Sequence, residues 1–184
     1  MSVTNFKGQF VKLAVTDLEA DTKLMMQWAK DGEFDRLLDT DPAYLRTPKF
    51  EQEWLQEHLK EMCNFMIHTL EDDRTIGFID LSGFDWTAGE AWVGIGIGER
   101  DYWGKGYGTD AMRVILRYAF EELNLRRVSL TVFEYNPRGI RSYEKAGFKI
   151  EGRARQAINR SGRRWDIIFM GILRSEWEAA QLLN

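Results

Sequence analysis

The stretch RDYWGKGYGTDAM, residues 100–112, places three glycines within five positions, just before a run with helical spacing. The N-terminus of a helix presents unpaired backbone N–H groups and a partial positive charge, so it binds anions that can approach it closely. Gly104, Gly106 and Gly108 carry no side chain that would block this approach, and glycine also permits a tight turn. The stretch therefore predicts a phosphate-binding loop; a plain glycine-rich turn before a helix is the alternative.

Two nucleotide-binding patterns compete for this loop. The P-loop needs GxxxxGK followed by Ser or Thr, which the sequence lacks. GYGTDA, residues 106–111, does match the dinucleotide pattern GxGxxA, and Glu134 ends the next strand, where a ribose ligand would stand. In that pattern the glycines follow a strand directly, whereas residues 99–103 intervene here. A dinucleotide site therefore remains an alternative to a different phosphate ligand.

The strand before the loop has one face almost without side chains. In WVGIGIG, residues 92–98, Val93, Ile95 and Ile97 point to one face, and Trp92 with three glycines points to the other. A face with so few side chains lets a ligand or another segment lie against the backbone. A slot beside this strand, leading to the anion-binding loop, suits a long ligand with a pyrophosphate in its middle. Close packing against a helix is the alternative interpretation.

Hydrophobic periodicity and turn residues predict a single α/β or α+β sheet domain spanning residues 1–184. We expect strands at 10–15, 64–70, 75–84, 90–98, 127–133, 148–158 and 164–173, and helices at 18–30, 49–62, 108–124 and 137–146. The last helix carries clear boundaries, because Asn136 is a good N-cap, Pro137 suits the first helical position and Gly147 suits the stop.

The composition is that of a globular chain with a substantial core. It has 184 residues, 44% of them hydrophobic, and three prolines. No apolar run reaches membrane-spanning length, and the first residues lack the apolar stretch of a signal peptide. Cys63 is the lone cysteine, so an intrachain disulfide is excluded, and its core-like neighbours favour packing over nucleophilic catalysis. We therefore expect a cytoplasmic protein with no membrane partner.

Charge is distributed unevenly along the chain. The net charge is −4, yet residues 17–73 hold fifteen Asp and Glu against six Lys and Arg, and residues 126–164 hold eleven Lys and Arg against three acids. This asymmetry suggests two ligands of opposite sign, or two solvated faces. The basic residues are spread over several elements, without zinc-finger spacing or an aromatic RNA-binding signature, so we expect no nucleic-acid partner.

Two motifs together resemble the GNAT superfamily of acetyl-CoA-dependent N-acetyltransferases, and more narrowly its RimJ/RimL-type branch. They are YWGKGYGTDAM, residues 102–112, and NPRGIRSYEKAGF, residues 136–148. The family's loop pattern is Gln or Arg, two residues, Gly, one residue, then Gly or Ala. Here Trp103 replaces the Gln or Arg, as is frequent in that branch. The pair is more specific than either motif alone, since two motifs in the expected strand, loop and helix context rarely coincide by chance.

The resemblance covers nearly the whole chain. In the second motif, Asn136, Tyr143 and the pair Gly147–Phe148 stand where the family has Asn, Tyr and Gly-Phe. WAKDGEF, residues 28–34, and RRWDIIFMGILRSEW, residues 163–177, also resemble the RimJ/RimL-type branch. The implied fold is a mixed, mostly antiparallel central sheet flanked by helices. Its fourth and fifth strands splay apart and form an acyl-CoA slot.

The resemblance also implies acetyl-CoA as cosubstrate. On this chain the splayed strands would be 90–98 and 127–133, with the pantetheine arm along the first of them and the pyrophosphate on the amides of residues 104–109. Lys105 would screen phosphate charge, and Asp110 must point away from the pyrophosphate. The implied acetyl-CoA ligands are Ile97, Gly98, Trp103, Gly104, Lys105, Gly106, Gly108, Thr109 and Asn136.

The chemistry needs no metal. An amine attacks the thioester carbonyl after losing a proton, and the departing thiolate accepts one. By resemblance Tyr143 is the acid at the thiolate, and Asn136 caps its helix while contacting pantetheine or substrate. Holding amine and thioester together would supply much of the rate.

The resemblance leaves the general base open. Related sequences often carry Glu on the fourth strand, where this chain has Trp92. Glu90 lies two residues earlier on the same face, so it is our candidate base, acting directly or through a water. Some members use a Glu on the fifth strand at the position of Thr131, while Glu134 faces the opposite way. Several relatives need no strong side-chain base.

The resemblance implies a primary amine as acceptor and leaves its identity open. RimJ/RimL relatives acetylate protein N-termini, and cousins acetylate polyamines, aminoglycosides or other small amines. The acidic first half favours a cationic amine. A domain that binds acyl-CoA without turnover, as a sensor or structural subunit, is the alternative function. Both a monomer and a homodimer remain open.

Overall fold

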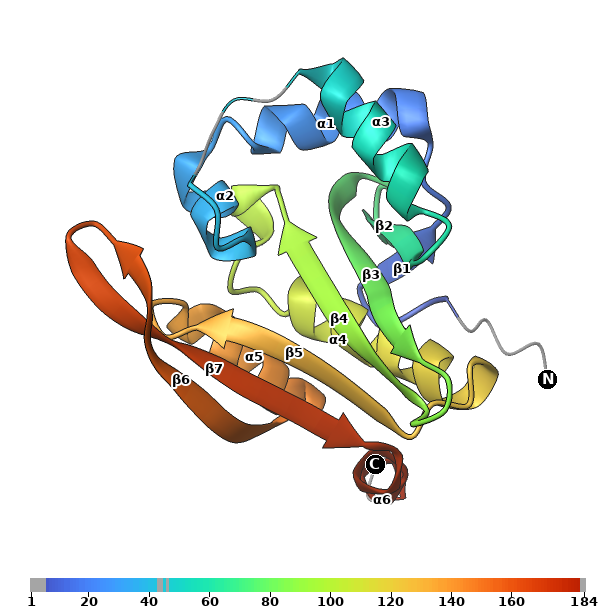
Figure 1. The fold of residues 1–184 in the computed structure, drawn as a ribbon. Helices are drawn as coiled ribbons and strands as arrows, with labels where there is room; N and C mark the ends of the chain where they lie inside the picture. Colours follow the sequence, from blue (N-terminus) through green and yellow to red (C-terminus); the bar gives the residue numbers. More distant parts are fainter. Residues whose placement is uncertain (1–5, 43–44, 46, 183–184) are drawn as a thin grey trace.

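In the part of the chain that the computed structural model describes, residues 6–42, 45 and 47–182, seven strands form one sheet in the order β1-β2-β3-β4-β5-β7-β6 (Figure 1). The strands are β1 (Val11–Ala14), β2 (Cys63–Thr69), β3 (Thr75–Asp85), β4 (Glu90–Ile97), β5 (Arg127–Phe133), β6 (Lys149–Arg160) and β7 (Arg163–Leu173). All neighbouring pairs are antiparallel except β4 and β5, which are parallel. The predicted mixed, mostly antiparallel sheet is confirmed.

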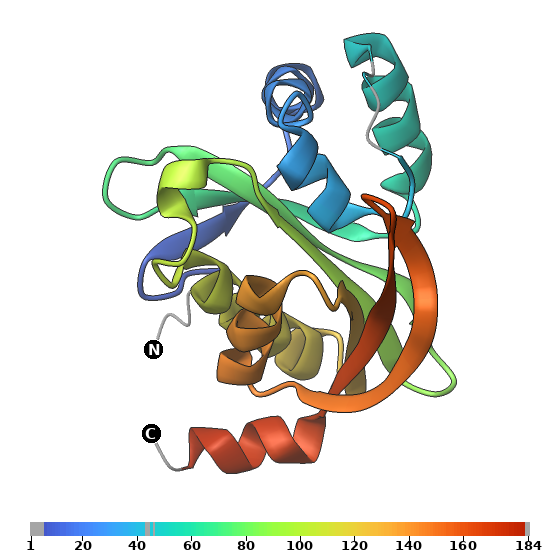
Figure 2. The ribbon, with the colours of Figure 1, turned by 90° about the vertical axis from the view of Figure 1, so that its left-hand side faces the viewer.

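Helices cover both faces of this sheet. They are α1 (Leu18–Trp28), α2 (Gly32–Leu38), α3 (Pro48–His58), α4 (Tyr107–Arg117), α5 (Pro137–Ala146) and α6 (Arg174–Gln181). The first three lie on one face, and α4 and α5 lie on the other, as the view in Figure 2 shows. The short 3₁₀ turn at Arg100–Tyr102 leads from β4 toward α4.

Strands β4 and β5 pair only at their beginnings. The register joins Glu90–Trp92 of β4 to Arg127–Ser129 of β5. Beyond Trp92 the two strands diverge, which Figure 1 shows as a widening gap between β4 and β5. The predicted splaying of these strands is therefore confirmed, and the later residues of β4 have no strand partner on that side.

The main core lies between the sheet and α4. Ala111, Met112, Ile115 and Leu116 of α4 are almost completely buried and belong to one cluster with the inward residues of the strands. Tyr118–Glu122 continues α4 as a π-helical turn, so the predicted helix over 108–124 contains an irregular last part. The apolar spacing of this segment thus predicted its burial correctly.

Asp110 ties the N-terminal segment to α4. Its carboxylate accepts backbone hydrogen bonds from Gln9 (3.0 Å), Phe10 (2.7 Å) and Val11 (3.0 Å). A methyl group added at Gly8 would lie 2.4 Å from the same carboxylate. The negative charge therefore lies in the first turn of α4, where the helix dipole stabilises it. Backbone amides of the N-terminal segment bind this carboxylate.

The C-terminal hairpin ends beside α2. Ser161 and Gly162, with φ of 52° and 73°, make the two-residue turn between β6 and β7. The Arg160 guanidinium donates to the carbonyl oxygens of Asp39 and Asp41, which follow α2. This hairpin and α2 therefore border the same end of the molecule, as Figure 1 also shows.

Three elements differ from the sequence prediction. Helices α2 and α6 were not predicted, and α3 ends at His58, four residues before the expected end. Helix α2 has seven residues, too few for hydrophobic periodicity to identify it. Its signal is a cap, because the Asp31 carboxylate accepts from the amides of Glu33 and Phe34.

Candidate functional site

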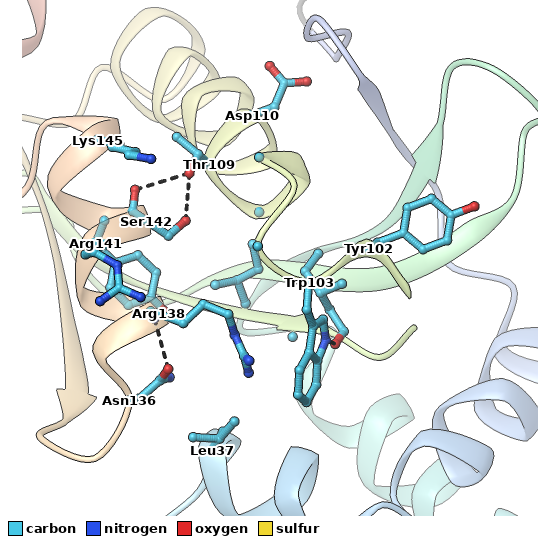
Figure 3. Close-up of a pocket in the computed structure, with 18 of the residues that line it drawn as sticks. Leu37, Tyr102, Trp103, Thr109, Asp110, Asn136, Arg138, Arg141, Ser142 and Lys145 are labelled. Atoms are coloured by element: carbon cyan, nitrogen blue, oxygen red, sulfur yellow. Dashed lines mark hydrogen bonds between the residues drawn. The ribbon is translucent and has the colours of Figure 1, made fainter. Parts of the chain in front are cut away.

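A cavity of about 400 Å³ lies where β4 and β5 diverge. Its walls come from four places: helix α2, the end of β4, the glycine loop with the start of α4, and helix α5 (Figure 3). The main wall residues are Phe34, Leu37, Leu38, Ile95, Gly96, Ile97, Trp103, Gly104, Gly106, Gly108, Thr109, Asn136, Arg138, Ser142 and Tyr143. Because α2 and α5 lie on opposite faces of the sheet, the cavity reaches both faces.

The glycine loop opens onto this cavity without side chains. Gly104 and Gly106 have φ of 73° and 95°, a region that L-residues rarely adopt. A methyl group would meet nothing within 4 Å at Gly104, and only the Phe10 ring at 3.8 Å at Gly106. Gly106 is the N-cap of α4 and makes no side-chain cap bond. The first amides of α4 are therefore available to an anion in the cavity.

The free edge of β4 continues the cavity. The Gly98 amide donates to the Ile76 carbonyl of β3, so by strand alternation the backbones of Ile95 and Ile97 face away from β3. At this level β5 has diverged, and these polar groups border the cavity. The Trp103 indole N–H donates to the Ile97 carbonyl oxygen at 2.5 Å, so one of these backbone polar groups already has a hydrogen-bond partner.

The face of β4 that lacks side chains is filled by the protein, which favours the close-packing interpretation. A methyl group would lie 1.9 Å from the Trp28 ring at Gly98, 2.9 Å from Phe78 at Gly96, and 2.7 Å from an Asp80 oxygen at Gly94. A ligand therefore cannot lie against the backbone of this face at Gly94 or Gly98, whereas Gly96 lines the cavity. The open slot is on the edge of β4, since β5 has diverged from it there.

Helix α5 places two candidate residues at the cavity. The Asn136 carboxamide oxygen accepts from the Gly139 amide at 2.9 Å, so the predicted N-cap is confirmed. Gly147 ends the helix with φ of 105°, as predicted. Tyr143 lies between them and lines the cavity. Burial raises the pKa of Tyr143 to about 12, so its hydroxyl is a proton donor at neutral pH.

Basic residues surround the outer part of the cavity. Arg138, Arg141 and Lys145 come from α5 and Arg113 from α4. The guanidinium of Arg138 lies 3.9 Å from the centre of the Trp103 ring, and burial lowers its pKa. These residues were not predicted from the sequence. Their spacing, three and then four residues apart on α5, places them on one helix face and was the available signal.

Helix α2 supplies an apolar wall that the sequence analysis also missed. Phe34, Leu37 and Leu38 line the cavity. The helix is fastened to the glycine loop, because Arg100 forms an ion pair with the capping residue Asp31, at 2.7 Å between Nη2 and Oδ1. This pairing lowers the pKa of the Asp31 carboxyl.

Most of the predicted site residues meet at this cavity. Those that line it are Ile97, Trp103, Gly104, Gly106, Gly108, Thr109, Asn136 and Tyr143. The Thr109 hydroxyl also hydrogen-bonds to the Ser142 hydroxyl at 2.8 Å, which joins α4 to α5 (Figure 3). The carboxylate of Asp110 points away from the cavity, toward the N-terminal segment.

Three predicted site residues lie elsewhere. Gly98 packs under Trp28, and Lys105 is exposed on the loop without lining the cavity. Glu90 stands at the opposite end of β4, where β5 is still paired, with its carboxylate 3.8 Å from the Arg127 Nε. Alternation predicted the face of β4 on which Glu90 lies, but not its position along the strand. Because Glu90 lies at the start of β4 and the cavity lies at its end, we no longer assign the base to it.

Among the described residues, no group of three or more His, Cys, Asp and Glu side chains is arranged to hold a metal ion. The helices of the described chain are all too short or too polar to cross a membrane.

The sequence matches known proteins along most of its length. The family model "Acetyltransferase (GNAT) domain" matches residues 12–149. The chain is 29% identical to the "SPbeta prophage-derived uncharacterized N-acetyltransferase YokL" of Bacillus subtilis (strain 168), over 97% of this chain and 98% of that protein. It is 35% identical to the "Putative ribosomal N-acetyltransferase YdaF" of the same organism, over 59% of each chain.

The fold matches a solved structure closely. The spermidine N-acetyltransferase of Vibrio cholerae, in complex with CoA and spermine, superimposes with a TM-score of 0.82. The two chains are 22% identical, and the match covers 91% of this chain and 98% of that one. The family model covers the glycine loop, β4, β5 and α5, which build the cavity. The chain therefore belongs to the GNAT acetyltransferase family, whose members transfer the acetyl group of acetyl-CoA.

Proposed function

We propose that this chain acetylates a primary amine by direct transfer, with acetyl-CoA and the acceptor bound at the same time, and that residues 1–184 form a single N-acetyltransferase domain. The observation that carries the proposal is the continuous path from the bare N-terminus of α4, along the free edge of β4, to Tyr143. A pyrophosphate fits the first part of this path, and a pantetheine arm fits the second. The dinucleotide alternative explains neither the free edge of β4 nor a tyrosine at its end.

The two faces of the cavity suit two substrates. Arg138, Arg141 and Lys145 on α5 favour the phosphates of CoA on their side of the sheet. Helix α2 covers the other side with Leu37 and Leu38. The acceptor therefore approaches from the face of α1, α2 and α3, and a ternary complex needs no covalent intermediate on the protein.

Five wall residues have defined roles in this proposal. The amides at Gly106 and Gly108 bind the pyrophosphate, and the backbone at Ile97 binds the pantetheine arm. Acetyl-CoA supplies the acetyl thioester. The Tyr143 hydroxyl donates its proton to the departing sulfur, since its raised pKa keeps it protonated until that step. The amide nitrogen of Asn136 is not used by the cap and is available to the substrates.

The acceptor we propose is a primary ammonium compound, either a polyamine or a protein N-terminus. The acidic composition of residues 17–73, which include α1, α2 and α3, supports a cationic acceptor. The similarity to a spermidine acetyltransferase fold supports a polyamine. The RimJ/RimL-type branch, to which we assign the chain, and the similarity to the protein named as a ribosomal acetyltransferase support an N-terminus.

A thiol-release assay tests the function. The purified protein is incubated with acetyl-CoA and either spermidine or trialanine, a peptide with a free N-terminus, and free CoA thiol is measured. We expect release that depends on the protein and on one of the two amines. Tight acetyl-CoA binding without release, for these and a wider amine panel, would instead favour a non-catalytic acyl-CoA-binding domain.

A further inference from the structure

Asp80 is a carboxylate close to the cavity that the roles above do not use. It lies in the middle of β3, directly opposite Gly94 of β4 in the sheet register. A methyl group added at Gly94 would lie 2.7 Å from Asp80 Oδ2, so the carboxylate rests on the bare backbone of β4. The next residue along β4, Ile95, lines the cavity. Asp80 is thus one residue beyond the inner end of the cavity.

The face on which Asp80 stands is the face from which the acceptor approaches. Gly96 shares this face with Gly94, and a methyl group there would lie 3.0 Å from the Leu38 side chain of α2. Leu38 also lines the cavity. The carboxylate, the cavity and α2 therefore meet on the same side of the sheet, at the level where β5 has left β4.

The neighbours of Asp80 are suited to an organic cation. On the same face Phe78 precedes it by two residues on β3, and Trp92 stands diagonally across on β4. Aromatic rings beside a carboxylate attract an ammonium group through their faces and bury its alkyl chain. Asp80 is largely buried with a small exposed part, and within the described chain it forms no ion pair.

The surroundings also set the protonation of Asp80. Burial raises its pKa to about 6, and a hydrogen bond from Ser82 partly opposes this. The residues across from it on β2 and β4, Asn64 and Gly94, carry no titratable group, and among the described residues no charged side chain contributes to the shift. A carboxylate with such a pKa is ionised at neutral pH and is a stronger base than an exposed aspartate.

We infer that Asp80 receives the primary ammonium group of the acceptor at the inner end of the cavity and takes the proton that this nitrogen must lose before attack. This inference rests on the proposed function, which it deepens by naming the group that recognises the acceptor. It replaces Glu90 as the candidate base.

The proton balance is as follows. Asp80 takes one proton from the ammonium nitrogen and later releases it to solvent. The freed lone pair forms the bond to the acetyl carbon, and the carbon–sulfur bond breaks. Tyr143 gives its proton to the sulfur, and the second proton lost by the nitrogen restores the Tyr143 hydroxyl. The products are the acetylated amine, CoA thiol and one proton in solution.

Calorimetry of the CoA complex tests the inference without turnover, because CoA carries no acetyl group. Spermidine and trialanine are titrated separately into protein saturated with CoA, at pH 7. We expect one of them to bind, and Asp80→Asn to weaken that binding at least tenfold without changing the affinity for CoA. Glu90→Gln is the matched control, a carboxylate on the adjacent strand outside the cavity, and it should bind like the wild type.

A second variant moves the carboxylate without removing it. Gly94→Ala places a methyl group against Asp80 Oδ2, so it should also weaken amine binding. This variant decides the question if thermal denaturation shows that Asp80→Asn is not folded. Wild-type amine affinity in a folded Asp80→Asn protein, or in Gly94→Ala in its place, would overturn the inference.

The pH dependence gives an independent readout. Both probes stay protonated below pH 7, so the titration of Asp80 governs the change. Amine affinity of the wild type should fall as the pH decreases through about 6, because the carboxylate is lost, and Asp80→Asn should be insensitive. Binding of spermidine alone identifies a polyamine site, and binding of trialanine alone identifies an N-terminus site. A wild-type CoA complex that binds neither amine overturns the ammonium site, whereas acetyl transfer itself is judged by thiol release.

Discussion

Tyr143 depends on the ends of its own short helix for its position. Asn136 caps the first turn of α5 through the Gly139 amide, and Gly147 ends it in a left-handed conformation. A methyl group at Gly139 would lie 2.6 Å from the Asn136 side chain, so the cap needs glycine there. These two capping interactions define the ends of the helix over Pro137–Ala146, and Tyr143 on this helix lines the cavity.

Replacement of the Tyr143 hydroxyl should slow the chemical step. Tyr143→Phe keeps the ring and its packing near Phe148, and removes only the proton donor. We expect single-turnover acetyl transfer to fall by about 10²–10⁴-fold, with acetyl-CoA affinity nearly unchanged. Tyr118→Phe is the control, since burial also raises the pKa of Tyr118 to about 12, and Tyr118 lies outside the cavity wall.

The measurement must isolate the chemical step, because slow product release would hide the loss in steady-state kcat. If Tyr143→Phe transfers the acetyl group at the wild-type single-turnover rate, the residue is a packed aromatic, and substrate positioning alone explains the catalysis.

Gly106 is needed for its backbone and for the space beside it. Gly106→Val adds a branched side chain to open space at the phosphate loop and strains the backbone by about 1–3 kcal/mol. We expect calorimetric binding of acetyl-CoA to be lost while the protein remains folded. Gly162→Val is the matched control, because Gly162 also has positive φ with open space, but it lies in the β6–β7 turn. Equal acetyl-CoA affinity in the two variants would disprove the phosphate loop.

Helix α2 shows how an element connects stability to the site. Its seven residues are too few to be stable alone, so its cap and its packing keep it in place. Arg100, from the turn after β4, binds Asp31 and also Glu33 at 2.8 Å. This contact fastens α2 to the segment that leads into the glycine loop, and Leu37 and Leu38 then close the cavity.

Loss of the Asp31 cap should therefore affect both stability and substrate binding. Asp31→Ala removes an N-cap worth about 0.5–2 kcal/mol and an exposed ion pair worth at most about 1 kcal/mol. We expect a lower midpoint in urea and a several-fold higher KM for acetyl-CoA. Asp17→Ala, which removes the equivalent cap of α1, should lower the midpoint with little change in KM. Equal KM changes in both variants would contradict a specific role for α2.

The sequence predicted the elements with strong local signals. Strand Arg127–Phe133 and the caps of α5 were predicted with the observed ends, because alternation, proline and glycine define them. Helix α2 was missed because only Asp31 marks it. The interpretation of the bare face of β4 as open to a ligand was wrong at Gly94 and Gly98 for another reason. Which side chains fill the space over Gly94, Gly96 and Gly98 depends on residues from β3, α1 and α2, distant in sequence.

The same limit applies to the site. Two motifs identified the glycine loop and Tyr143 as parts of the cavity wall, because their geometry is local. The position of Glu90 depended on how far β4 runs before β5 diverges, and Asp80 depended on the register of β3 against β4. Both are tertiary features. A strand residue can be assigned to a face from alternation, but its level along the cavity needs the sheet.

At the scale of the whole molecule, the sheet separates two differently charged regions. The basic residues Arg138, Arg141 and Lys145 on α5 line the cavity on one face. The acidic segment 17–73 includes the helices of the other face. The charge counts in the sequence allowed either two ligands of opposite sign or two solvated faces, and our proposal takes the first, with an anionic cofactor and a cationic amine. Other basic residues, such as Arg155 on β6, lie outside this cavity and are not explained by it.

Ligand binding should stabilise the whole fold, because the cavity joins elements that lie far apart in the sequence. Its walls come from α2, β4, α4 and α5, so a molecule that spans them binds only the native state. At about 100 times its Kd, such a ligand adds about 2.7 kcal/mol to the free energy of unfolding. Acetyl-CoA and CoA should therefore raise Tm in a thermal scan by several degrees, in proportion to the logarithm of their concentration, while NAD and NADP at equal concentration should not. The phosphates are common to all four molecules, but only the pantetheine arm can follow the free edge of β4 past Ile97 and Ile95. A rise in Tm with NAD and not with CoA would restore the dinucleotide interpretation of residues 106–111, because a pyrophosphate on the glycine loop would then be sufficient without the slot.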